Sequence, residues 1–89
     1  DPLWSRGLGD VYKRQGVTAN AIAPGYMATD NTAQLRADQD RNKSILDRIP
    51  AARWGVPADL GGAAVFLASS ASDYVNGAII PVDGGWLAR

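Results

Sequence analysis

The segment of residues 16–29, Gly-Val-Thr-Ala-Asn-Ala-Ile-Ala-Pro-Gly-Tyr-Met-Ala-Thr, restricts the possible folds of this chain more than any other. It carries no charged side chain on either face, which is typical of a strand in a parallel sheet that is covered on both sides. Pro24 has no N–H to give to a neighbouring strand, so the strand should end there. Gly25 lacks a Cβ and therefore allows a turn or a close approach of the backbone to a ligand.

The loop at Pro24 and Gly25 has two interpretations on these residues alone. Pro-Gly after a strand is commonly an ordinary turn. In open α/β sheets, however, ligands bind in the crevice outside the carboxyl ends of the strands, which is where this loop would lie. The remainder of the chain has to decide between a turn and a binding loop.

A polar helical stretch is expected from Thr29 to about Ile49. Its first residues, Thr-Asp-Asn-Thr at 29–32, have side chains that cap helices. Apolar anchors are few, and residues 37–43 are mostly charged or amide-bearing. A segment with so few buried contacts belongs to the low-stability part of a structure, from which lids are drawn. The alternative is a plain pair of surface helices.

A second helix is expected after Pro57, because a first helical position needs no N–H. Gly61 and Gly62 each cost about 1 kcal/mol of helix propensity relative to Ala, so we expect them to contact a neighbouring backbone closely. Apolar residues occupy almost the whole circumference of this helix, which indicates burial on more than one side. They are Leu60, Ala63, Ala64, Val65, Phe66 and Leu67.

Residues 78–82 should form the second strand. Pro81 lies inside it, and a central strand would lose a ladder hydrogen bond there, so an edge strand is predicted. Strand, helical connection and strand make one βαβ unit of an α/β fold. Because two strands alone are marginally stable in water, we expect this chain to be the end of a larger fold.

Composition excludes several classes of function. Nine Lys and Arg balance nine Asp and Glu, so no overall charge attracts nucleic acid or an anionic membrane. The chain has neither Cys nor His, which removes thiolate and imidazole metal ligands, disulfides and the commonest general base. No apolar run approaches the ~20 residues of a membrane-spanning helix. We expect no metal site, no membrane partner and a cytoplasmic protein.

Residues 1–15 do not read like the rest of the chain. They show no sustained periodicity, and their Leu-Gly-Asp-Val-Tyr-Lys-Arg-Gln run looks like translated adapter sequence. A genuine disordered arm is the alternative. We therefore divide the chain into a non-family stretch, 1–15, and a single partial domain, 16–89.

Several motifs in residues 16–89 together resemble the carboxyl-terminal third of classical short-chain dehydrogenases/reductases. They occur in the order and spacing of that family: Asn20-Ala-Ile-Ala-Pro24-Gly25, Thr29, Pro50 with Arg53-Trp-Gly55, Pro57-Ala-Asp59, Phe66-Leu-Ala-Ser69 and Val82-Asp83-Gly84-Gly85. The resemblance implies that the βαβ unit is the carboxyl-terminal part of a Rossmann-like, doubly wound parallel sheet. The segments 31–38, 45–50 and 83–89 are more narrowly similar to the sugar-acid subgroup. Its members are described as 2-deoxy-D-gluconate 3-dehydrogenases or 2-dehydro-3-deoxy-D-gluconate 5-dehydrogenases.

The resemblance implies roles for individual residues. Pro24 and Gly25 would shape the loop on the nicotinamide side of the cofactor, and the backbone of Met27 would meet the carboxamide. Thr29 would offer its hydroxyl and N–H near the carboxamide and phosphates, a role that a helix start with free N–H groups can fill. The alternative for Thr29 is a simple helix cap. Tyr26 and Leu35 would line the substrate side.

The resemblance also shows what the chain lacks. The family transfers protons with a Ser, a Tyr and a Lys, and no residue here matches them: a Tyr-x-x-x-Lys starting at Tyr12 would need Lys at Gly16. The implied parent is an NAD-dependent oxidoreductase that moves a hydride between nicotinamide and a sugar acid and assembles as a homotetramer. A 3-oxoacyl carrier-protein reductase, a glucose dehydrogenase or a non-catalytic piece that only associates with intact subunits are the alternatives.

Overall fold

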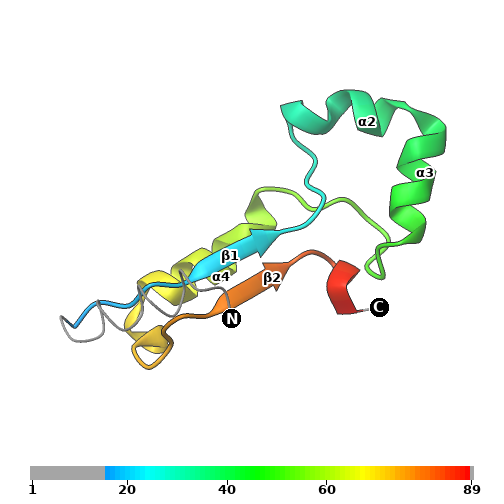
Figure 1. Ribbon diagram of the computed structural model, residues 1–89. Helices are drawn as coiled ribbons and strands as arrows, with labels where there is room; N and C mark the ends of the chain where they lie inside the picture. The colour runs from blue at the N-terminus through cyan, green and yellow to red at the C-terminus, as the bar shows by residue number, and fades with distance from the viewer. Residues whose placement is uncertain (1–15, 89) are drawn as a thin grey trace.

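The computed structural model describes residues 16–88, so the expected boundary at residues 15 and 16 and the adapter-like stretch before it lie outside the described part. Two parallel strands, β1 (Ala21–Pro24) and β2 (Ile79–Val82), are joined by helical segments that include α4 (Ala58–Ala68). Figure 1 shows β1 and β2 side by side, with α4 behind them. The predicted βαβ unit and the α/β fold class are confirmed.

Strand β1 is shorter than the sequence pattern indicates, because the residues before it are held by asparagine side chains. Ala19 N–H donates to Asn76 Oδ1 at 3.0 Å, and Asn20 Nδ2 donates to the Val75 carbonyl at 3.1 Å. Asn20 Oδ1 in turn accepts from Ala78 N–H at 2.8 Å. These bonds replace a regular ladder, so the paired strand begins at Ala21 and ends at Pro24 as predicted.

Pro81 lies where its missing N–H does no harm. Ala21 N–H donates to the Ala78 carbonyl at 2.8 Å, and Gly25 N–H donates to the Val82 carbonyl at 3.0 Å. Since backbone groups alternate in direction along a strand, even-numbered residues of β2 face β1 and Pro81 faces outward. The described sheet has two strands only, so each has a single neighbour, and the edge position of β2 in a larger sheet stays a prediction.

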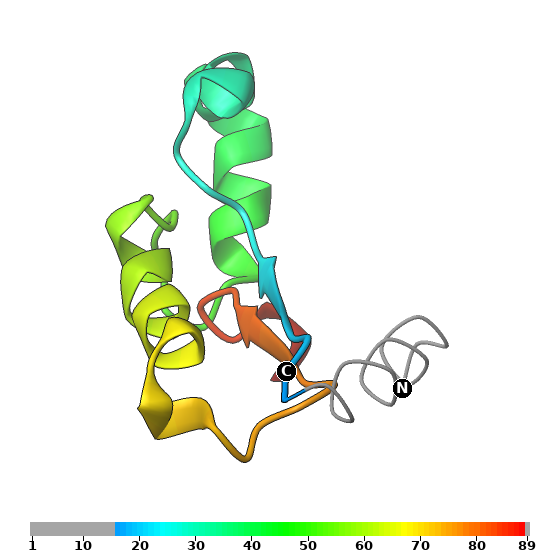
Figure 2. The same ribbon diagram turned by 90° about the vertical axis from the view of Figure 1, so that its left-hand side faces the viewer.

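Helix α4 covers one face of the sheet and not two. Leu60, Ala63 and Leu67 are half-buried, whereas Val65 is 68% exposed and Phe66 is 38% exposed. Figure 2 shows α4 on one side of the two strands only. The prediction of a helix buried on more than one side is therefore wrong for the described part of the chain, because nothing described there packs on its outer face.

The glycine pair of α4 also differs from expectation. A Cβ built on Gly61 or on Gly62 would meet no atom within 4 Å among the described residues. The close backbone contact that the sequence analysis expected there is absent from the described structure. Their cost in helix propensity is therefore not offset by a contact within residues 16–88.

The polar stretch forms what we call the helical lobe, residues 30–48. It contains a short 3-10 helix η1 (Asp30–Thr32), α2 (Ala33–Ala37) and α3 (Gln39–Asp47). The break falls at Asp38, whose backbone is extended and whose carboxylate accepts the Arg41 N–H at 3.2 Å. The lobe stands beyond the carboxyl ends of both strands (Figures 1 and 2). The expected helical stretch is confirmed and is divided into a helix pair; the position of the break at Asp38 was not predicted.

The chain closes with η2 (Ser70–Ser72), strand β2 and η3 (Trp86–Ala88). Gly84 and Gly85 have φ values of +65° and +97°, which favour glycine over other residues. A Cβ on Gly84 would lie 2.9 Å from Cγ2 of Ile49, the hydrophobic side chain that is most buried in the described structure, at 4% exposure. None of the described helices has the length and hydropathy needed to cross a membrane.

Candidate functional site

The loop after β1 begins with a tight contact at Gly25. A Cβ built there would lie 2.7 Å from both Cα and Cβ of Asp83, closer than real Cβ atoms approach their neighbours. Asp83 cannot retreat easily, because its carboxylate accepts the N–H groups of Gly85 at 2.9 Å and Leu87 at 3.3 Å. Within the described residues the backbone at Gly25 thus closely approaches the chain segment after β2, and its approach to a ligand stays a prediction.

Met27 has its backbone fixed by a single bridge to the connector before α4. Gly55 donates its N–H to the Tyr26 carbonyl at 2.9 Å, and its carbonyl accepts the Ala28 N–H at 2.7 Å. The N–H and carbonyl of Met27 consequently point away from Gly55. The carbonyl accepts the Thr32 hydroxyl at 2.6 Å, whereas the N–H makes no hydrogen bond to any residue in the range 16–88. A donor is thus left available at this end of the sheet.

Thr29 is the N-terminal cap of η1, with an extended backbone at φ −134° and ψ 177°. Its N–H donates to the Thr32 hydroxyl oxygen at 3.1 Å, and its carbonyl accepts Nη2 of Arg36 at 2.9 Å. The interpretation of Thr29 as a helix cap is confirmed. Thr29 and Thr32 form a reciprocal capping box, in which the Thr29 side chain accepts the Thr32 N–H and the Thr32 side chain accepts the Thr29 N–H, so the hydroxyl proton is the Thr29 donor that remains for a ligand.

Thr32 is a residue that the sequence analysis did not single out. Its hydroxyl joins the loop at Met27 to the start of the lobe, and Nε of Arg36 donates to the same oxygen at 3.3 Å. The sequence feature that could have indicated Thr32 is its spacing of three residues from Thr29, which matches the N-cap and N3 positions of a capping box.

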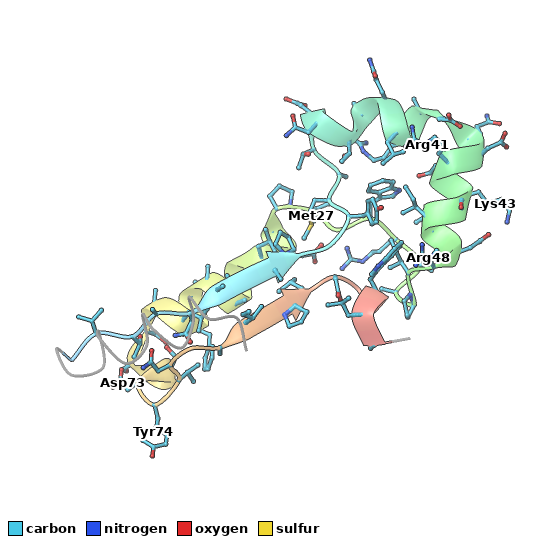
Figure 3. The ribbon with its side chains drawn as sticks, in the orientation of Figure 1. Met27, Arg41, Lys43, Arg48, Asp73 and Tyr74 are labelled. Atoms are coloured by element: carbon cyan, nitrogen blue, oxygen red, sulfur yellow. The ribbon has the colours of Figure 1, made fainter. Side chains whose placement is uncertain are left out.

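An aromatic cluster surrounds Tyr26 and connects four parts of the chain. The Tyr26 ring lies 5.6 Å from Trp54 in an edge-to-face arrangement and 5.0 Å from Trp86, measured between ring centroids. Nε1 of Trp54 donates to Oδ1 of Asn42 on α3 at 2.6 Å. The guanidinium carbon of Arg48 lies 4.2 Å from the Trp86 ring centroid, within cation–π range. Figure 3 shows Arg48 directed inward from the end of α3.

An ion pair fixes the connector against the start of α4. Arg53 Nη1 and Nη2 donate to the two carboxylate oxygens of Asp59 at 2.8 and 3.0 Å, and Val56 N–H donates to Oδ2 at 2.7 Å. The hydrogen bond from Arg53, followed by that from Val56, lowers the pKa of Asp59 from 3.8 to about 2. The carboxylate therefore stays charged at any physiological pH and holds the connector that bridges to Met27.

The predicted site residues gather around Tyr26 in three places. Pro24 and Gly25 line a hollow of about 320 Å³ together with Tyr26, Asp83 and Trp86. Met27 lies between the end of β1 and the lobe, as Figure 3 shows, and lines a smaller hollow with Tyr26 and Gly55. Leu35 meets Tyr26 at a third hollow under the lobe, whereas Thr29 lines none of the three. Among residues 16–88, no group of three or more acidic, Cys or His side chains could hold a metal ion.

A parallel βαβ unit with an ordered loop outside the carboxyl ends of its strands places this chain among the Rossmann-like α/β proteins. A family model described as enoyl-(acyl carrier protein) reductase matches residues 3–87. The chain belongs to the short-chain dehydrogenase/reductase family, and the resemblance found in its sequence is confirmed.

Relatives with assigned activities are similar over most of this chain. A 2-dehydro-3-deoxy-D-gluconate 5-dehydrogenase of Dickeya dadantii is 71% identical, and one of Escherichia coli is 65% identical, each over 85 residues and 96% of this chain. A solved gluconate 5-dehydrogenase of Burkholderia cenocepacia, in complex with NADP and tartrate, is 41% identical over 98% of this chain with a TM-score of 0.92. The aligned residues make up 34% of each of these three proteins, so the chain spans about a third of their length.

Proposed function

We propose that this chain is the carboxyl-terminal part of a short-chain dehydrogenase that transfers a hydride between a nicotinamide cofactor and a sugar acid. The observation that carries the proposal is the 71% identity to the Dickeya 2-dehydro-3-deoxy-D-gluconate 5-dehydrogenase over residues that include the loop and the lobe. Residues 16–88 supply one wall of a cofactor site and one wall of a substrate site. The groups that transfer protons would belong to the rest of the protein.

The loop fits the carboxamide end of a nicotinamide cofactor. The unpaired Met27 N–H supplies a donor for the carboxamide oxygen, and the Thr29 hydroxyl supplies a second polar contact beside it. Pro24 and Gly25 set the path of the backbone between β1 and these two groups. When bound, the cofactor would accept or deliver the hydride; the role of these residues is to orient its nicotinamide end.

The form of the cofactor is a separate part of the proposal. Similarity to the sugar-acid subgroup favours NAD, whereas the Burkholderia relative was solved with NADP. Measuring kcat/KM with each cofactor decides between them, and a preference for NADP would overturn the choice of NAD without affecting the proposed reaction.

The test is a chimeric enzyme in which residues 16–89 replace the matching segment of the Dickeya relative. We expect it to oxidise or reduce 2-dehydro-3-deoxy-D-gluconate and its reaction product with efficiency close to that of the unaltered relative. The unaltered relative is the control for folding and assay. A chimera that folds but prefers an acyl thioester or glucose to the sugar acid would refute the proposed substrate class.

A second candidate function is association without catalysis. Val65 and Phe66 on α4 and Leu87 after β2, which is 71% exposed, leave apolar side chains uncovered in the described part of the chain. In the intact protein we propose that this surface contributes to a homotetramer. Co-expression of residues 16–89 with the full-length chimera tests association: recovery of a stable complex supports it, and separate elution of the two contradicts it.

A further inference from the structure

The hollow beneath the helical lobe has the shape and chemistry of a small-molecule subsite. It is an open hollow of about 300 Å³, bordered by the loop after β1, by α2 and by residues 40–45 of α3. A volume of this size lies at the lower end of ligand pockets and suits a molecule of six carbons. Its lining residues are Tyr26, Leu35, Asp40, Arg41, Ser44 and Ile45.

The polar residues of this hollow lie on one face of α3. Arg41, Ser44 and Ile45 are three and four residues apart and therefore share a face, with Asp40 one turn before Ser44. Lys43 belongs to the opposite side, where it pairs with Asp47 at 2.7 Å. Figure 3 shows Lys43 pointing away from the molecule and Arg41 near the corner between α2 and α3.

Arg41 differs from the other cations that the structure describes. Arg36 donates to the Thr29 carbonyl, Lys43 pairs with Asp47, Arg48 lies over Trp86 and Arg53 pairs with Asp59. The Arg41 guanidinium makes no hydrogen bond or ion pair to any residue between 16 and 88, although it lines the hollow. Its planar group of five donors matches a carboxylate with two parallel hydrogen bonds.

The other polar groups of the hollow suit hydroxyls better than charges. Ser44 can donate or accept, and Asp40 accepts hydrogen bonds from hydroxyl groups and would repel a carboxylate placed next to it. A polyhydroxy acid satisfies both conditions if its carboxylate meets Arg41 and its hydroxyls meet Asp40 and Ser44. Tyr26 also lines the hollow and precedes Met27 in the loop after β1, so a substrate held by Arg41 would lie next to the cofactor loop.

We propose that Arg41 binds the carboxylate of the substrate, and that Ser44 and Asp40 bind its hydroxyls. This inference rests on the proposed function, since it names how the sugar acid is recognised. Arg41 selects acids over neutral sugars, while Leu35 and Ile45 supply the apolar wall against which the carbon chain lies.

The test uses Arg41→Gln and Arg41→Lys in the chimeric enzyme. Loss of hydrogen bonds to a charged group should raise KM for 2-dehydro-3-deoxy-D-gluconate about 10- to 100-fold in Arg41→Gln, with an unchanged KM for the cofactor. Arg41→Lys should give a KM between those of the unmutated chimera and Arg41→Gln, because lysine keeps the positive charge but loses the two parallel hydrogen bonds. Lys43→Ala is the matched control on the same helix, and it should leave KM unchanged.

A binding measurement separates charge recognition from a general structural effect. Tartrate, a hydroxy acid, and threitol, its neutral counterpart, serve as probes in calorimetric titrations of the chimera with cofactor bound. Arg41→Gln should weaken tartrate binding and leave threitol binding as it was. Equal weakening of both probes, or none, would overturn the assignment of Arg41.

The proposed function can fail separately. If the unmutated chimera binds tartrate through Arg41 but turns over no sugar acid, the anion subsite stands and the proposed reaction is refuted. If it turns over the sugar acid with the same KM in wild type and Arg41→Gln, the reaction stands and the subsite is refuted.

Discussion

Replacing Gly25 by Ala in the chimeric enzyme should destabilise it, because the loop after β1 is pressed against the segment after β2. The added Cβ would sit 2.7 Å from two carbon atoms of Asp83, whereas carbon atoms pack favourably at about 3.5–4.0 Å. Neighbouring backbone would have to move by roughly 1 Å, given that difference in packing distance. Asp83 is held by its own bonds to Gly85 and Leu87, so the displacement falls on the pairing of Gly25 with Val82.

Two terms set the expected magnitude of this change. Overpacking of this kind costs about 1–3 kcal/mol. Weakening the Gly25 to Val82 hydrogen bond, 3.0 Å long in the native loop, adds about 0.5–1.5 kcal/mol. We therefore expect a loss of about 2–4 kcal/mol in the free energy of unfolding.

Gly61→Ala is the matched control for the same substitution without the clash. A Cβ at Gly61 meets nothing within 4 Å in the described structure, and a helix gains about 0.8–1.0 kcal/mol when an interior Gly becomes Ala. Urea unfolding followed by circular dichroism measures both variants on one scale. Equal stability of the two variants would refute the tight contact at Gly25, and destabilisation by Gly61→Ala would show that a part of the protein beyond residues 16–88 packs against α4.

Further predictions concern the cofactor loop, the ion pair and the aromatic cluster. Thr29→Ala should weaken cofactor binding about 5- to 10-fold, because one hydrogen bond is lost, and should change the free energy of unfolding by less. Unchanged cofactor affinity in a titration would contradict the assigned contact. Because the pKa of Asp59 is depressed in the folded state, its carboxylate stabilises the protein at pH values above its ordinary pKa of 3.8, and this stabilisation is lost as the pH falls towards about 2. Asp59→Asn should therefore flatten that part of the acid-unfolding curve, and an unaltered curve would contradict the prediction. Trp86→Leu should lower the free energy of unfolding by about 1–2 kcal/mol, because the contacts with Tyr26 and Arg48 are lost. It should also speed amide hydrogen exchange in α3, and unchanged exchange would contradict the contact between Arg48 and Trp86.

Local patterns were sufficient to predict the elements of the sheet. Pro24 is the last residue of β1, Pro57 starts a helix because a first helical position needs no N–H, and Pro81 is tolerated only where a strand faces outward. Each of these effects depends on one residue and its immediate neighbours. They could therefore be recognised without knowing which distant segments come together.

Contacts between distant segments were not predictable in this way. Tyr26 and Trp86 are separated by most of the described chain, and no periodicity links them. The position of the helix break at Asp38 was not predicted because a capping side chain inside a polar stretch looks like any other surface residue. The role of Met27 was suggested by resemblance alone, and its unpaired N–H became visible only once the bridge to Gly55 was known.

The outward position of Pro81 has a consequence for how the sheet can be extended. The outer edge of β2 lacks a donor at its centre, so a further strand added there would lack a hydrogen bond in its middle. On the other side, the backbone groups of Ile22 point away from β2 and are available to a strand from another part of the protein. The two edges of this unit therefore differ. The outer edge of β2 disfavours edge-to-edge aggregation, and the outer edge of β1 can pair with the remaining sheet.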